Sequence, residues 1–141
     1  VADTGNHRVL YWTQLPRTSD TAASYVIGQT AFNRSVSGTS QTALRAPTAI
    51  SSDGVRIYIA DSGNNRVVQL NAFPILDGDS FDDLYGQGTY SVSLANDSDQ
   101  DGDVDDTPSD NTLDTPTGVL VDDGVLFISD RNNHRIMLHQ P

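Results

Sequence analysis

The chain has 141 residues, a formal net charge of −11 at pH 7, no cysteine, and neither glutamate nor lysine. The lack of cysteine excludes disulfides and thiolate metal sites, and the lack of a long apolar run excludes a membrane span within these residues. Two good helix formers are missing while Val, Ile, Thr, Ser, Asn and Gly abound, which indicates a protein rich in strands and turns.

One sequence pattern occurs three times along the chain. Residues 1–12 (VADTGNHRVLYW) return as residues 59–70 (IADSGNNRVVQL) and as residues 128–139 (ISDRNNHRIMLH). The second copy lies 58 residues after the first and the third lies 69 residues after the second, so 11 additional residues fall between Gln87 and Pro116. Self-similarity of this kind is the signature of a repeat architecture.

The repeats divide into short predicted strands. Residues 1–29 predict the C-terminal part of one four-stranded unit, and residues 47–87 predict a complete unit with the strands PTAISSD, RIYIAD, RVVQL and DDLYGQ. Residues 88–115 predict a long loop, and residues 116–139 predict the first three strands of a further unit. The inner strands are apolar at successive positions, which favours burial on both faces. We expect five side chains to pack between the units: Ile57, Ile59, Val68, Leu126 and Ile128.

Antiparallel four-stranded units that pack face to face around an axis make a β-propeller. The predicted fold class is therefore all-β, with β-propeller blades of four antiparallel strands in a partial propeller. A propeller needs about four to eight blades to close, and the chain supplies fewer. The sequence thus predicts a piece of a longer protein, or a chain that completes a ring by self-association. Exposed strand edges would make an isolated chain a poor monomer.

The turn from Asp to Arg is the most specific pattern in the chain. We expect the Asp to accept hydrogen bonds from backbone donors two residues on, and Gly, or Asn132 in the third copy, to adopt a positive φ. The Arg is expected to hold neighbouring backbone or carboxylate groups. Recurrence in every unit favours a structural role over a ligand site. The predicted turn residues are Asp3, Asn6, Arg8, Asp61, Asn64, Arg66, Asp130, Asn133 and Arg135.

On these residues the chain resembles the NHL-repeat family of propellers. The stretch PTAISSDGVRIYIADSGNNRVVQL follows the family pattern throughout, and PTGVLVDDGVLFISDRNNHRIMLH departs from it only at Arg131 and Asn132. The segments IGQTAF and YGQGTY resemble bacterial members in which Gly-Gln follows the outer strand. The resemblance implies that the units are NHL blades of a parent with six blades as a rule. It also implies that the parent binds other macromolecules, and some members of the family are enzymes.

The long loop contains an acidic segment, NDSDQDGDVDD, at residues 96–106. Seven of the 19 acidic residues lie between positions 97 and 110, and removing seven negative charges from −11 leaves −4. The D-x-D-x-D-G spacing resembles calcium loops of the EF-hand and thrombospondin type 3 kinds. It predicts Ca²⁺ ligands at Asp97, Asp99, Asp101, Asp103 (by its carbonyl) and Asp105. The twelfth position is Pro108 instead of the bidentate Glu of an EF-hand, which predicts weak affinity. The alternative is a solvated acidic loop that binds no ion.

Three classes of function follow from these patterns. The first is a non-catalytic scaffold that binds a protein or glycan through the loop face; weak calcium binding suits an extracellular, cell-surface or periplasmic place. The second is a propeller enzyme, lyase-like or hydrolase-like, with its active site on the central axis. Only His7, His134 and His139 could supply imidazole there, and the first two are expected to be ordinary turn residues equivalent to Asn65. The third, nucleic-acid binding, is disfavoured by the absence of lysine and the negative charge.

Overall fold

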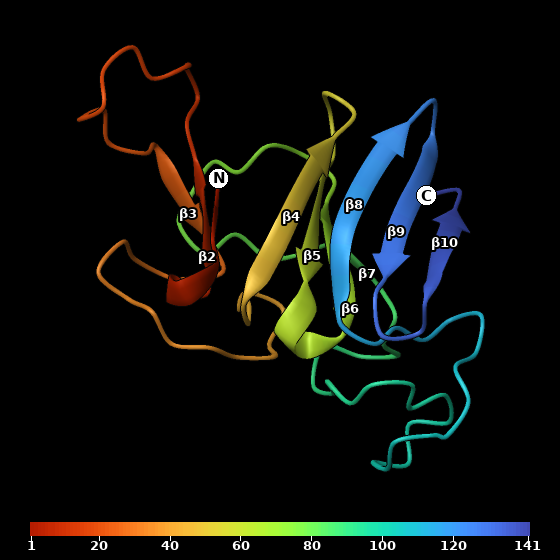
Figure 1. The fold of residues 1–141 in the computed structure, drawn as a ribbon. Coiled ribbons are helices and arrows are strands. Elements are labelled where there is room, and N and C mark those ends of the chain that lie inside the picture. The colour runs from red at the N-terminus through yellow and green to blue at the C-terminus, as the bar shows by residue number, and fades with distance from the viewer.

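The computed structural model describes all residues, 1–141, and consists of three antiparallel sheets that stand side by side (Figure 1). No α-helix is present, only two single-turn 3-10 helices, η1 (Thr4–Asn6) and η2 (Ser62–Asn64), so the all-β prediction is confirmed. Neither of these helices has the length and hydropathy needed to cross a membrane.

Each sheet runs through its strands in chain order. The first contains β1 (Ala2–Asp3), β2 (Arg8–Tyr11) and β3 (Tyr25–Ile27). The middle sheet has four strands, β4 (Pro47–Ser52), β5 (Ile57–Asp61), β6 (Arg66–Leu70) and β7 (Asp83–Tyr85). The third contains β8 (Pro116–Asp122), β9 (Val125–Asp130) and β10 (Arg135–His139). The outer strand β7 is shorter than DDLYGQ, the segment predicted for it.

The core lies in two layers, one on each face of the middle sheet. Ile57, Ile59 and Val68 belong to a buried cluster shared with β2 and β3 of the first sheet. Leu126 and Ile128 belong to a second cluster, which the third sheet shares with the other face of β5 and β6. All five residues are buried, as predicted. Because a sheet covers each face of β5 and β6, every residue of these two strands is buried.

The two junctions between neighbouring sheets repeat the same contacts. The hydroxyl of Thr4 donates to the carbonyl of Pro47 over 2.7 Å, and the hydroxyl of Ser62 donates to the carbonyl of Pro116. These donors occupy the same position in successive repeats, directly after the Asp of the turn. The first strands of the middle and third sheets also meet, since the Val121 amide donates to Ser51 Oγ over 3.0 Å.

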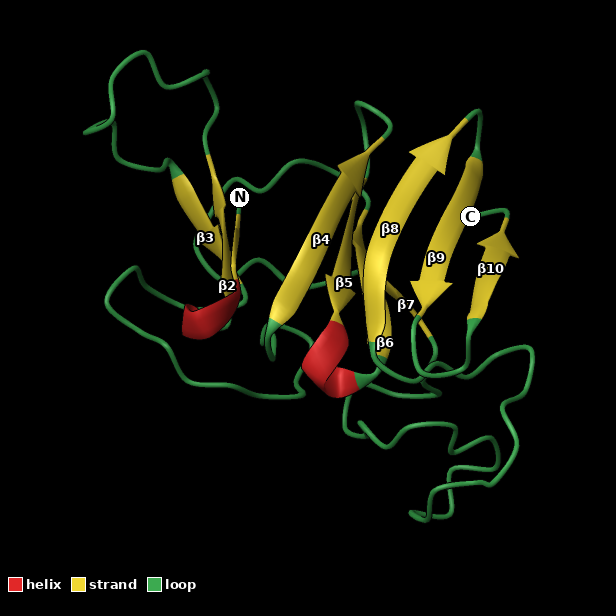
Figure 2. Ribbon diagram, viewed as in Figure 1, coloured by secondary structure: helices red, strands yellow, loops and turns green.

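The long loops and the Asp-to-Arg turns lie at one edge of the three sheets. Figure 2 shows η1, η2 and the β9–β10 turn at this edge, together with the loops that follow β3 and β7. The β4–β5 and β8–β9 turns lie at the opposite edge. The edge that carries the loops is therefore where the fold gathers its irregular segments, and we call it the loop face.

Candidate functional site

Each Asp-to-Arg turn is closed by an ion pair. The Arg Nε lies 2.7, 2.8 and 2.7 Å from the Asp Oδ2 in the first, second and third turns, respectively. The Asn three residues after the Asp donates to the same carboxylate, at 2.9, 2.8 and 2.8 Å. The nine turn residues singled out in the sequence thus form three copies of one Asp–Asn–Arg contact.

The backbone of the turn differs from the prediction in two ways. Positive φ occurs at the fourth residue after the Asp, at His7, Asn65 and His134, because each of these residues ends a tight turn in the left-handed conformation. Gly63 has an ordinary φ; it is needed for space, since a Cβ there would lie 2.6 Å from Arg45 Cγ. The expected backbone donor two residues on is also wrong. Asp61 instead accepts from the Arg45 amide of the preceding loop over 2.6 Å.

In the first two turns, the left-handed residue links the turn to the following sheet. His7 Nδ1 accepts from the Ala46 amide at 3.0 Å, and Asn65 Oδ1 accepts from the Thr115 amide at 2.8 Å. His7 and Asn65 therefore have the same role, which is to accept a hydrogen bond from a backbone amide, as the equivalence of their positions predicts. The three histidines do not join any cluster of potential metal ligands.

The turn arginines also hold the loops. Arg66 donates to the carbonyls of Thr39 and Ala43 at 2.7 and 3.0 Å, and Arg135 donates to the carbonyl of Thr112 at 2.8 Å. Arg66 and its partner Asp61 are fully buried. The guanidinium groups of Arg66 and Arg135 thus each join a strand end to the loop that arrives from the neighbouring sheet.

The Gly-Gln segment after the outer strand has a role that the sequence reasoning missed. Gln29 Nε2 donates to the carbonyls of His7 and Val36 at 3.0 and 2.9 Å. Gln87 Nε2 makes the equivalent bonds to Asn65 and Leu94 at 3.2 and 2.7 Å. The recurrence of Gln at a 58-residue spacing was the available signal, because a repeated polar residue next to a strand usually has a repeated partner.

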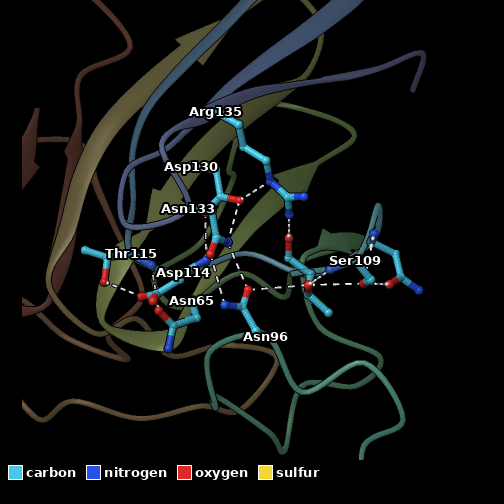
Figure 3. Close-up of polar contacts among 10 residues, drawn as sticks. Asn65, Asn96, Ser109, Asp114, Thr115, Asp130, Asn133 and Arg135 are labelled. Carbon is cyan, nitrogen blue, oxygen red and sulfur yellow. Dashed lines mark hydrogen bonds and ion pairs between the residues drawn. The ribbon is translucent and has the colours of Figure 1, made fainter. Parts of the chain in front are cut away.

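The acidic loop is fastened to the third sheet next to its first predicted ligand. The side-chain amides of Asn96 and Asn133 bond each other reciprocally at 3.0 and 2.9 Å (Figure 3), and Asn133 also donates to Asp130. Further along, the loop returns beside the end of β7, where Thr112 bridges to Gly86. Asp97 follows Asn96 directly and is therefore held in place by the scaffold.

The fold brings three of the predicted carboxylates together. Asp97, Asp99 and Asp101 each offer an oxygen, and these oxygens lie within 4.8 Å of one another. Asp99 and Asp101 are exposed, whereas Asp97 is only 1% exposed. Both carboxylate oxygens of Asp97 are buried without a hydrogen-bond partner. An ionised carboxylate without donors is strongly unfavourable in such a place, and nearby like charges add to the cost.

The other two predicted ligands lie differently. Asp105 Oδ2 accepts from the amide of Ser98 at 2.9 Å and also from the Ser98 hydroxyl. These hydrogen bonds from Ser98 lower the pKa of the Asp105 carboxyl, and Asp105 is not part of the group of three. The Asp103 amide donates to Asp101 Oδ1 at 2.9 Å and so orients one of the clustered carboxylates. The carbonyl of Asp103 remains the predicted ligand at that position.

A cavity of about 200 Å³ lies where the acidic loop meets the end of β7. Asp97, Gln87 and Gln100 supply polar groups to it, and Tyr85 and His139 form part of its wall. The rings of Tyr85 and His139 lie 5.1 Å apart between centroids. Burial raises the pKa of Tyr85 to about 12 and lowers the pKa of His139, so both side chains are favoured in their neutral forms.

No protein-family model matches this chain, and a search of curated proteins finds no significant match.

Proposed function

We propose that the chain forms consecutive blades of an NHL-type β-propeller, a non-catalytic scaffold whose loop face binds a macromolecule and is stabilised by calcium. Support for the propeller comes from the two sheet junctions, which repeat the same side-chain contacts at equivalent positions. A constant relation between successive sheets is what a propeller requires. The complete blade would be the middle sheet, with its four strands.

A single observation, the environment of Asp97, supports the calcium site. Asp97 is buried, both of its oxygens are without donors, and it lies beside the carboxylates of Asp99 and Asp101. A hard cation would neutralise the cluster and give the Asp97 oxygens their missing partner. Acidic and carbonyl oxygens with no sulfur or histidine among them suit Ca²⁺. The affinity is expected to be about 10⁻⁴ to 10⁻³ M, as in extracellular modules, which supports an extracellular, cell-surface or periplasmic location.

Isothermal titration with millimolar CaCl₂ tests the site. The parent should bind one Ca²⁺, while Asp97→Asn and Asp99→Ala should lose most of the heat. Asp20→Asn makes the same charge change as Asp97→Asn on a remote exposed loop and serves as the matched control. Mg²⁺ should bind more weakly because it retains its waters and prefers a smaller octahedral shell. Absence of heat from the parent, or equal heat from the Asp97 variant, would leave the segment as an acidic spacer.

The loop face is the proposed surface for a protein or glycan partner. Long loops on a rigid scaffold commonly carry binding residues, and here they expose the apolar side chains of Phe32, Val36 and Val104. A screen of immobilised glycans and extracellular protein domains, with and without calcium, would identify the class of partner. Binding by the parent that is lost in Phe32→Ser and kept in Leu15→Ser, an exposed residue outside this face, would support the proposal. Equal loss in both variants would contradict it.

The outer faces of the first and third sheets are proposed to pack against further blades, from the same polypeptide or from other copies. Ile136 and Leu138 on β10 are 56% and 59% exposed. Ile136 is the repeat equivalent of Val67, which is fully buried between the middle and third sheets. Light scattering of the purified chain tests this proposal, and a stable compact monomer would count against it.

A further inference from the structure

Two residues that line the cavity under the acidic loop, Asp97 and Gln87, carry buried acceptor oxygens without donors. These oxygens are Oδ1 and Oδ2 of Asp97 and Oε1 of Gln87. Gln87 is 8% exposed and Asp97 is 1% exposed. A buried acceptor left without a partner is unfavourable, and a charged one is more so. Unsatisfied oxygens therefore belong to two different segments beside the cavity, the acidic loop and the segment after β7.

The equivalent residue in the preceding repeat, Gln29, does not have such an oxygen. Gln29 makes the same two Nε2 hydrogen bonds as Gln87, but its Oε1 is not among the buried oxygens that lack a partner. The second repeat differs by the inserted acidic loop, which lies against Gln87 and joins the backbone there through Gln100 Oε1 and the Gly88 amide at 3.1 Å. The acidic loop therefore lies beside Gln87 and offers its Oε1 no donor.

No positively charged side chain lines the cavity. Beside Asp97, the ionisable side chains in the wall are Tyr85 and His139, and burial lowers the pKa of His139, which favours its neutral form. The walls therefore carry an uncompensated carboxylate and an amide oxygen. Ca²⁺ commonly takes both kinds of ligand, carboxylates and Asn or Gln carbonyls, in a shell of about 6 to 8 oxygens.

We propose that Gln87 Oε1 is a ligand of the same calcium ion that Asp97, Asp99 and Asp101 bind, and that the ion fastens the acidic loop to the end of β7. This inference rests on the calcium site proposed above. Gln87 is suited to the role because its Nε2 is fixed by the carbonyls of Asn65 and Leu94, which leaves the oxygen in one orientation. The Asn96–Asn133 pair already ties the loop to the third sheet, so the bound ion would join the middle and third sheets through the loop.

The test compares Gln87→Ala with Gln29→Ala in the full chain. Gln29→Ala removes the equivalent Nε2 bonds but no proposed ligand, so it is a matched control. Calcium affinity is measured by calorimetry, and inner-shell water is counted from Tb³⁺ luminescence lifetimes in H₂O and D₂O. Gln87→Ala should weaken calcium binding about 10-fold or more and add about one water to the bound ion. Gln29→Ala should change neither quantity.

A third variant, Gln87→Glu, separates the oxygen from the Nε2 donor. It loses the bonds to Asn65 and Leu94 but keeps an oxygen, so we expect it to retain binding and the parent's hydration number. Unchanged affinity and hydration in Gln87→Ala would overturn the inference while leaving the Asp site intact, as would weaker binding with unchanged hydration. Failure of the parent to bind calcium would remove the proposed site itself. If Gln87→Ala does not fold, loss of binding in a folded Gln87→Glu would overturn the inference.

Discussion

Replacement of Arg66 by methionine should reveal how strongly the middle turn depends on its buried ion pair. Arg66 Nε lies 2.8 Å from Asp61 Oδ2, and both side chains are completely buried. The substitution leaves Asp61 without its charged partner and removes the donors to the Thr39 and Ala43 carbonyls. Breaking a buried pair in this way costs about 3 to 5 kcal/mol. That is a large share of the roughly 5 to 15 kcal/mol by which domains are stable.

Arg8→Met in the first turn is the internal comparison. Its ion pair has nearly the same length, 2.7 Å, but the side chains of Arg8 and Asp3 are 16% and 26% exposed. Water can solvate the remaining carboxylate there, so the expected loss is about 1 kcal/mol. Urea unfolding followed by circular dichroism measures both changes in the free energy of unfolding. Equal losses in the two variants, or a loss below about 1 kcal/mol for Arg66→Met, would refute burial as the deciding factor.

Three further predictions concern single positions. Gly86→Ala should lower the free energy of unfolding by about 2 kcal/mol or more, because Gly86 has a φ of +95° and a Cβ there would lie 2.6 Å from Leu113 Cδ1. His7→Asn should be neutral within about 0.5 kcal/mol, whereas His7→Ala should cost about 1 to 2 kcal/mol because the Ala46 amide loses its acceptor. Burial raises the pKa of Tyr85 from 10.0 to about 12, so the unfolded chain loses this proton first and stability should fall as the pH rises between these values.

A specific result would contradict each of these three predictions. A fully stable Gly86→Ala variant would mean that Leu113 moves aside at no cost. Equal stabilities of the two His7 variants would show that the Nδ1 contact contributes nothing. For Tyr85, the absorbance at 295 nm of Tyr85→Phe is compared with that of the parent during alkaline titration. The variant should lack a transition that the parent shows near pH 12. If the transition that it lacks lies near pH 10, the predicted pKa shift of Tyr85 is contradicted.

Local pattern was sufficient to predict the strands and the residues between the sheets. The runs RIYIAD and RVVQL are apolar at successive positions because a sheet lies on each face of β5 and β6, and Ile59 and Val68 are buried accordingly. The repeat also predicted which turn residues share a role. The repeat did not predict the backbone conformation of the turn correctly. Gly63 is required because space there is short, and the left-handed residue is Asn65. That difference depends on Arg45, which reaches the turn from the preceding loop.

The amino-acid spacing marks Asp97 and Asp105 as similar candidate ligands, and only the tertiary structure distinguishes them. Asp97 is buried next to Asn96, which pairs with Asn133, a residue 37 positions further along the chain, while Asp105 turns back to Ser98 within its own loop. The role proposed for Gln87 likewise depends on the inserted loop, which lines the same cavity. Spacing determines which carboxylates can approach one another along the chain. Contacts between distant segments decide which oxygen loses its water, because burial and the absence of donors are properties of the assembled fold.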